Sequence, residues 1–193
     1  MSQHSKASPK TNRRSFLQGT GLGLLSFSLG GANVLLSPRQ ARAQDADFKL
    51  LDASEVSILE AFGEVLVPGA RAAGIAHFVD QQMSVDPNES LFMAKYLNVP
   101  PPYADFYRAG LAALNRLSQA LFDKDFDVIS QTDAIDLVRT ISSSVPDGWE
   151  GPPAPLFYIC VRADAVDVVY GSVEGFAKLK IPYMPHILPP ENW

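Results

Sequence analysis

Three pairs of carboxylates have the spacing at which two side chains share one face of a helix. The pairs are Glu60 with Glu64, Asp133 with Asp136, and Asp164 with Asp167. Like charges at this spacing usually lie in water, and we expect this of the first two pairs. Asp164 and Asp167 differ, because apolar residues surround them nearly all round the predicted helix. Buried carboxylates need polar partners, which we expect either within the domain or on another subunit.

The histidines and the cysteine form no pattern typical of a metal or catalytic site. His77 and His186 are isolated in sequence, and no His-x-x-x-His or Cys-x-x-Cys-His motif is present. A Gly-x-Ser-x-Gly elbow and a phosphate-binding loop are also absent from the sequence. Cys160 lies in an apolar run, which favours a buried thiol, and the alternative is a disulfide to a partner subunit. We therefore predict no catalytic residue, cofactor site or metal site in this chain.

Residues 1–43 have the order of features of a twin-arginine export signal. Arg13 and Arg14 precede Phe16 and Leu17, and a modestly apolar stretch rich in Gly and Ser follows. Ala41-Arg42-Ala43 then gives a small-x-small pattern, which predicts cleavage after Ala43. We expect a periplasmic protein that crosses the membrane already folded. An uncleaved membrane anchor over residues 17–36 is the alternative.

Residues 44–193 then form the mature domain. All 21 acidic residues of the chain lie there with ten of its 16 basic residues, so the formal charge of this part is −11. A domain this acidic repels nucleic acid and anionic lipid, so we expect no nucleic-acid partner and membrane association only through other proteins. About half of the 193 residues are apolar, at 47%, which is typical of a globular protein with a buried core.

The apolar periodicity predicts an all-α fold, a single compact domain of about six helices. The expected helices span residues 53–66, 72–83, 88–97, 103–122, 130–141 and 155–170, with a further short one over 172–180. Leu121 and Ile135 fall on the predicted inner faces of two of them. Residues 181–190 hold four prolines and cannot form a regular helix, so we expect an extended C-terminal tail.

Residues near the C-terminus are candidates for an interface with a partner protein, because an irregular apolar tail that stayed free in water would leave its apolar side chains exposed. The alternative is a tail packed on its own domain. The predicted interface residues are Asp164, Asp167, Tyr170, Tyr183, Met184, His186 and Trp193.

Several short blocks occur in the order seen in a known family, and together they cover most of the mature chain. They are the export motif Arg13-Arg14-Ser15-Phe16-Leu17 and residues 59–70, 73–80, 107–114, 164–171, 174–176 and 181–187. On these blocks the chain resembles subunit 3 of gluconate 2-dehydrogenase and its relatives. These small subunits accompany flavoprotein dehydrogenases of the glucose-methanol-choline type.

The resemblance implies a division of labour among subunits. A large flavoprotein subunit holds FAD and the oxidising site, lacks its own export signal, and crosses the membrane bound to the small subunit. A multihaem cytochrome c subunit often passes the electrons onward. This chain would then be a non-catalytic escort and stabilising subunit. Two alternatives are a stand-alone periplasmic binding or scaffold protein, and an enzyme that uses Asp164, Asp167 and His186.

Overall fold

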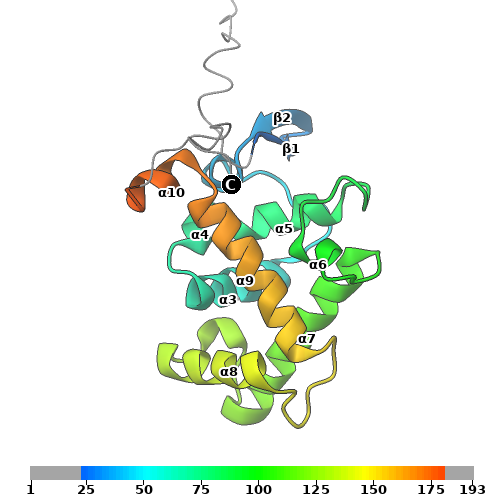
Figure 1. The fold of residues 1–193 in the computed structure, drawn as a ribbon, viewed down its shortest axis with the longest axis vertical. Coiled ribbons are helices and arrows are strands. Elements are labelled where there is room, and N and C mark those ends of the chain that lie inside the picture. Colours follow the sequence, from blue (N-terminus) through cyan, green and yellow to red (C-terminus); the bar gives the residue numbers. More distant parts are fainter. Residues whose placement is uncertain (1–22, 181–193) are drawn as a thin grey trace, which may run out of the picture.

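The computed structural model describes residues 23–180 of the chain. This part begins with a β-hairpin. Strand β1 (Leu25–Leu29) pairs antiparallel with β2 (Ala32–Leu36). Gly30 and Gly31 connect them with φ of 56° and 81°, as a two-residue turn with two positive φ angles requires. The hairpin is not predicted from sequence, because its short strands show no long alternation and its apolar residues are attributed to an export signal. It occupies the top of Figure 1.

A short helix, α2 (Pro38–Ala43), follows the hairpin and packs on the domain. Ser37 caps its first turn by accepting from the backbone of Gln40, whose side chain in turn accepts from the backbone of Ser37. Ala41 of α2, Phe27 of β1 and Ala46 form a small apolar cluster. Residues 25–46 thus contribute a satellite core beside the main one.

The next helices follow the predictions except where glycine interrupts them. Helix α3 (Ala53–Leu66) has the predicted bounds, and a capping box between Asp52 and Glu55 closes its first turn. The single helix predicted over 72–83 is wrong, because Gly74 has φ of 84° and separates α4 (Ala70–Ala73) from α5 (Ile75–Met83). Of the helix predicted over 88–97, only α6 (Met93–Tyr96) forms.

The C-terminal half of the domain is close to its prediction. It contains α7 (Tyr103–Phe122), the 3-10 turn η1 (Phe126–Val128), α8 (Gln131–Ser143), α9 (Ala154–Tyr170) and α10 (Val173–Lys178). Two inner positions are wrong, since Leu121 and Ile135 are both exposed. Leu121 lies in the last turn of α7, and Ile135 lies at an edge of the apolar stripe of α8.

Helix α9 runs diagonally through the middle of the domain, with the hairpin beyond one end and α8 near the other (Figure 1). It contacts α3, α4, α5, α6, α7, α8 and α10, which makes it a central element of the described domain. Its inner side chains join the main core with Phe62, Phe78 and Leu114. The predicted all-α fold is confirmed for the described residues, with the hairpin as an addition.

Two side-chain contacts fix how α7 and α9 cross. Tyr107 lies against Asp164, and Gly110, one turn further along α7, lies against Phe157, nearly two turns earlier on α9. The two helices therefore run antiparallel at this point. A Cβ at Gly110 would lie 2.3 Å from a ring carbon of Phe157, so only glycine allows the observed approach.

We expect Gly110→Ala to destabilise the domain by about 1–3 kcal/mol, although alanine favours a helix, because the added methyl overlaps the Phe157 ring. Urea unfolding measures the change. Ala112→Ser, at an exposed position of the same helix, is the control. In the double variant Gly110→Ala/Phe157→Leu the smaller side chain relieves the overlap, so the loss should be less than the sum of the single losses. Additive losses would contradict this account of the crossing.

Candidate functional site

Helix α9 positions most of the predicted functional residues in the described chain. Pro155 lies in its first turn, where a missing N–H costs nothing. Phe157, Cys160, Asp164 and Val168 recur at helical spacing and are buried against the domain. Because α9 is apolar nearly all round, its opposite side also carries apolar side chains.

Asp164 is fully buried, with 0% of its surface exposed. Tyr107 of α7 donates its hydroxyl proton to Oδ2 of Asp164 across 2.5 Å. Oδ1 of the same carboxyl lacks a hydrogen bond of good geometry, although the backbone of Met93 lies near enough to lower the pKa of Asp164. Of the two kinds of partner expected for this carboxylate, the structure provides the one within the domain. Asp164 is therefore not part of the accessible surface that another subunit could contact.

Burial raises the pKa of Asp164 from its ordinary 3.8 to about 8, because the charged form would lose its hydration. The hydrogen bond from Tyr107 lowers this pKa, and the nearby charge of Asp167 raises it further. Burial and the same carboxyl also raise the pKa of Tyr107 well above its ordinary value. At neutral pH the pair is therefore a neutral acid beside a neutral phenol, which avoids an uncompensated charge in the core.

Asp167 and Tyr170 lie in the last turn of α9, and both are partly buried. Burial raises the pKa of Asp167. Ile159 and Val166 are 47% and 38% exposed, and with Tyr170 they recur at spacings of seven and four residues, which places them on one side of the helix. We call Ile159, Val166 and Tyr170 the α9 outer face. It is an apolar stripe with Asp167 at one edge and the exposed Arg162 at the other.

Cys160 is a free cysteine in the core with no exposed surface. Burial and the nearby Asp164 raise the pKa of its thiol to about 12, so the thiol stays protonated and unreactive. The buried alternative is therefore the one observed. A disulfide to a partner subunit would need this side chain to leave the core.

His77 lies on the buried side of α5 and holds the segment that follows α2. Its Nε2 lies 3.1 Å from the carbonyl oxygen of Ala46, so this nitrogen carries the proton and donates. The ring packs on Phe48, with 4.3 Å between ring centroids, and meets Phe27 edge-on. Burial lowers the pKa of His77, which favours the neutral ring. His77 is therefore a core residue that anchors the segment after α2.

One buried carboxylate with a clear structural role is not identified from sequence. Asp80 of α5 accepts three backbone N–H bonds, from Lys49, Leu50 and Leu51, at 2.8–2.9 Å. It lies one turn after His77, so both side chains hold residues 44–51. The signal in the sequence that could have indicated this role is the spacing of His77 and Asp80, two polar residues one turn apart in a largely apolar helix.

The remaining predicted residues are placed as follows. Ala41 and Ala43, the predicted cleavage residues, lie in α2. Arg13, Arg14, Phe16, Leu17, Tyr183, Met184, His186 and Trp193 lie outside the described residues.

Between residues 23 and 180, no three His, Cys, Asp or Glu side chains gather closely enough to hold a metal ion. Over the same range no helix combines the length and the apolar character needed to span a bilayer. The described part of the alternative anchor, residues 23–36, forms the hairpin instead of a helix.

The sequence model of the family described as gluconate 2-dehydrogenase subunit 3 matches residues 53–188, from the start of α3 into the tail. No curated protein and no solved structure matches the chain.

The raised pKa of Asp164 predicts a pH dependence of stability. The folded chain keeps this proton up to about pH 8, whereas the unfolded chain releases it near the ordinary value of 3.8. The contribution to the free energy of unfolding is therefore full below about pH 4 and is lost as the pH rises to about 8, by at most about 1.4 kcal/mol per pH unit.

Asp164→Asn should remove this slope, because asparagine still accepts from Tyr107 but does not titrate. Urea unfolding at several values between pH 5 and pH 8 measures it. Asp136→Asn, at an exposed position of α8, is the matched control and should keep the slope of the wild type. Equal slopes for Asp164→Asn and the wild type would show that Asp164 does not titrate as described.

Proposed function

The chain belongs to the gluconate 2-dehydrogenase subunit 3 family, and from this premise we propose that it escorts and stabilises an exported FAD-dependent sugar or alcohol dehydrogenase. Membership in this family implies that the chain is one subunit of a multisubunit gluconate dehydrogenase complex. The family match over residues 53–188 is the observation that carries the proposal. In this proposal the chain itself is non-catalytic, and FAD belongs to the partner flavoprotein.

The export part of the proposal rests on the sequence of residues 1–43. Arg13-Arg14-Ser15-Phe16-Leu17, the apolar stretch and Ala41-Arg42-Ala43 occur in the order of a twin-arginine signal. This route carries folded proteins, so a flavoprotein without its own signal could cross bound to this chain. The complex would then work in the periplasm, held at the outer face of the inner membrane through its partners, among them a multihaem cytochrome c.

The α9 outer face is the described surface that best suits the flavoprotein. Ile159 and Val166 are exposed and share one side of α9 with the partly buried Tyr170, and protein interfaces are enriched in aromatic and aliphatic side chains at their centre. Asp167 adds a polar group at the rim. The predicted tail residues Tyr183, Met184, His186 and Trp193 would extend the same interface, since the tail begins just after α10, which contacts α9.

The alternative of an enzyme that uses Asp164, Asp167 and His186 is not favoured. Asp164 lies inside the core with Tyr107 as its partner, so no substrate can reach it without unfolding. The stand-alone binding or scaffold protein remains the competing hypothesis. Capture of the mature chain from a periplasmic extract of its host distinguishes them. A yellow complex active in dye-linked oxidation of sugars or alcohols supports the escort, and a single colourless chain supports the competitor.

Replacement of both signal arginines, Arg13→Lys/Arg14→Lys, should leave the flavoprotein in the cytoplasm, because the escort that carries it is no longer exported. Dye-linked dehydrogenase activity in periplasmic and cytoplasmic fractions measures this. Lys6→Gln/Lys10→Gln changes two nearby charges outside the motif and should leave export intact. A flavoprotein that still reaches the periplasm with the lysine variant would refute the escort role.

Ile159→Arg/Val166→Arg should weaken capture of the flavoprotein at least tenfold, because two charges would be buried at the centre of the interface. Co-purification of the two chains, quantified by flavin absorbance, measures the loss. Leu121→Arg/Ile135→Arg places the same charges on exposed apolar positions of α7 and α8 and is the control. Equal loss in both double variants would indicate general destabilisation, and no loss in the first would remove α9 from the interface.

A further inference from the structure

The segment that ends at the predicted cleavage site is part of the folded domain. Helix α2 contacts β2, α4 and α5, and Ala41 at its centre has no exposed surface. A signal peptidase reads small side chains at Ala41 and Ala43, three residues and one residue before the cut. Ala43 is exposed but Ala41 is buried, so one of the two recognition side chains is out of reach while α2 stays in place.

The groove that receives α2 depends on Gly74. A Cβ at this glycine would lie 2.1 Å from the carbonyl oxygen of Pro38, so any side chain here would push α2 away. The φ of 84° at Gly74 is also a conformation that other residues rarely adopt. The break between α4 and α5 therefore serves as the contact surface for the backbone of α2.

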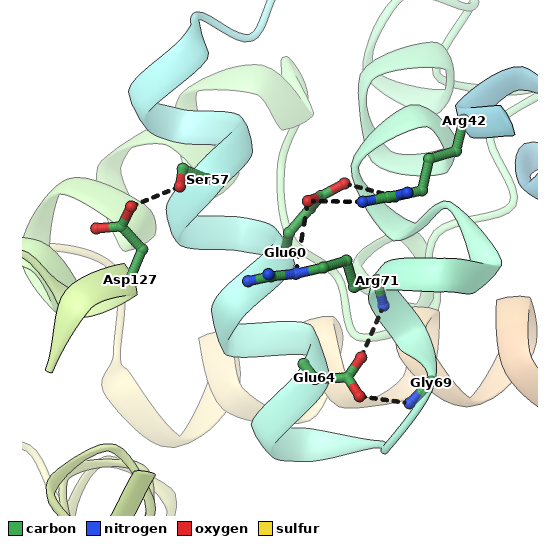
Figure 2. A network of polar contacts seen from close by, with 7 residues as sticks. All are labelled: Arg42, Ser57, Glu60, Glu64, Gly69, Arg71 and Asp127. Atoms are coloured by element: carbon green, nitrogen blue, oxygen red, sulfur yellow. Dashed lines mark hydrogen bonds and ion pairs between the residues drawn. The ribbon is translucent and has the colours of Figure 1, made fainter. Parts of the chain in front are cut away.

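An ion-pair network holds the other side of α2. Glu60 of α3 accepts from Nε and Nη2 of Arg42 at 2.9 and 3.4 Å, and its second oxygen lies 3.6 Å from Nε of Arg71 (Figure 2). Glu60 is only 15% exposed, so water screens this network less than it would screen a fully exposed pair. Glu64, one turn further along α3, accepts from the backbones of Gly69 and Arg71 and does not touch α2.

The chain just after the predicted cut is also held. Asp80 accepts the three N–H groups of residues 49–51, and His77 binds the carbonyl of Ala46. Ala43–Gln44 thus lies between two anchored segments. The N–H of Gln44 continues the helix by donating to the carbonyl oxygen of Gln40, and the N–H of Asp45 donates to that of Arg42. Proteases act on chain that opens out of such contacts, at a rate set by the population of the open form.

We propose that α2, docked in the groove between Gly74 and Glu60, is a latch that withholds the Ala43–Gln44 bond from signal peptidase until the latch is released. The step under control is hydrolysis of this amide by water, which leaves a carboxylate on Ala43 and an amino group on Gln44. The inference rests on the export signal of the proposed function and not on the flavoprotein partner.

The test uses the purified full-length chain and purified signal peptidase in detergent micelles, with intact mass recording the cut after Ala43. A synthetic peptide of residues 32–50 gives the unlatched rate. The wild type should be cut at least about tenfold more slowly than the peptide. Glu60→Gln removes the charge that holds Arg42 and should be cut about two- to tenfold faster than the wild type.

Glu64→Gln is the matched control, because it alters the start of α4 without touching α2, and it should be cut at the wild-type rate. Gly74→Ala opens the same latch by steric overlap, so it replaces Glu60→Gln if that variant does not fold. Wild type cut as fast as the peptide would overturn the latch. Equal acceleration of cleavage by Glu60→Gln and Glu64→Gln would also overturn it. Two further outcomes would do the same: no acceleration by Glu60→Gln and Gly74→Ala, or a peptide that is not cut at all. Because no flavoprotein is present, these outcomes are independent of the escort role.

Discussion

The antiparallel crossing of α7 and α9 is the constraint on which the rest of the described domain depends. Helix α9 contacts seven other elements, so its position sets theirs. The crossing is close because Gly110 has no side chain, and it carries a carboxyl group, Asp164, into the core. A charge there would be costly, and the domain avoids it by keeping the acid neutral and giving it the Tyr107 hydroxyl. The outer side of the same helix is then left free for a partner.

Asp80 shows the opposite solution to the same problem of a buried acid. It receives three backbone N–H groups, whereas Asp164 receives one hydroxyl. Asp80 therefore attaches residues 49–51 to α5, whereas Asp164 joins α7 to α9. The two acids have different structural roles, because one attaches the N-terminal segment to the domain and the other holds the centre of the domain together.

Local sequence signals predicted most helices but not the contacts between them. Asp52 with Glu55, and Ser130 before α8, mark helix starts through their own neighbours in sequence. The break at Gly74 was missed, because a glycine within an apolar period does not reveal a positive φ. Tyr107 as the partner of Asp164, and Asp80 as an anchor, were missed for another reason. Both depend on residues about 30 to 60 positions away, which periodicity within one helix cannot identify. The exposure of Leu121 and Ile135 likewise depends on which neighbours pack beside them.

The left-handed backbone conformation at Gly74 has an evolutionary consequence. This one position tolerates no side chain without displacing residues 37–43. Loss of the glycine in a lineage would thus separate residues 37–43 from the domain in a single step and would also strain the turn between α4 and α5. Descendants of such a change would carry an N-terminal segment that evolves independently of the surface beneath it. Lineages that keep the glycine would have to change Arg42 and Glu60 together.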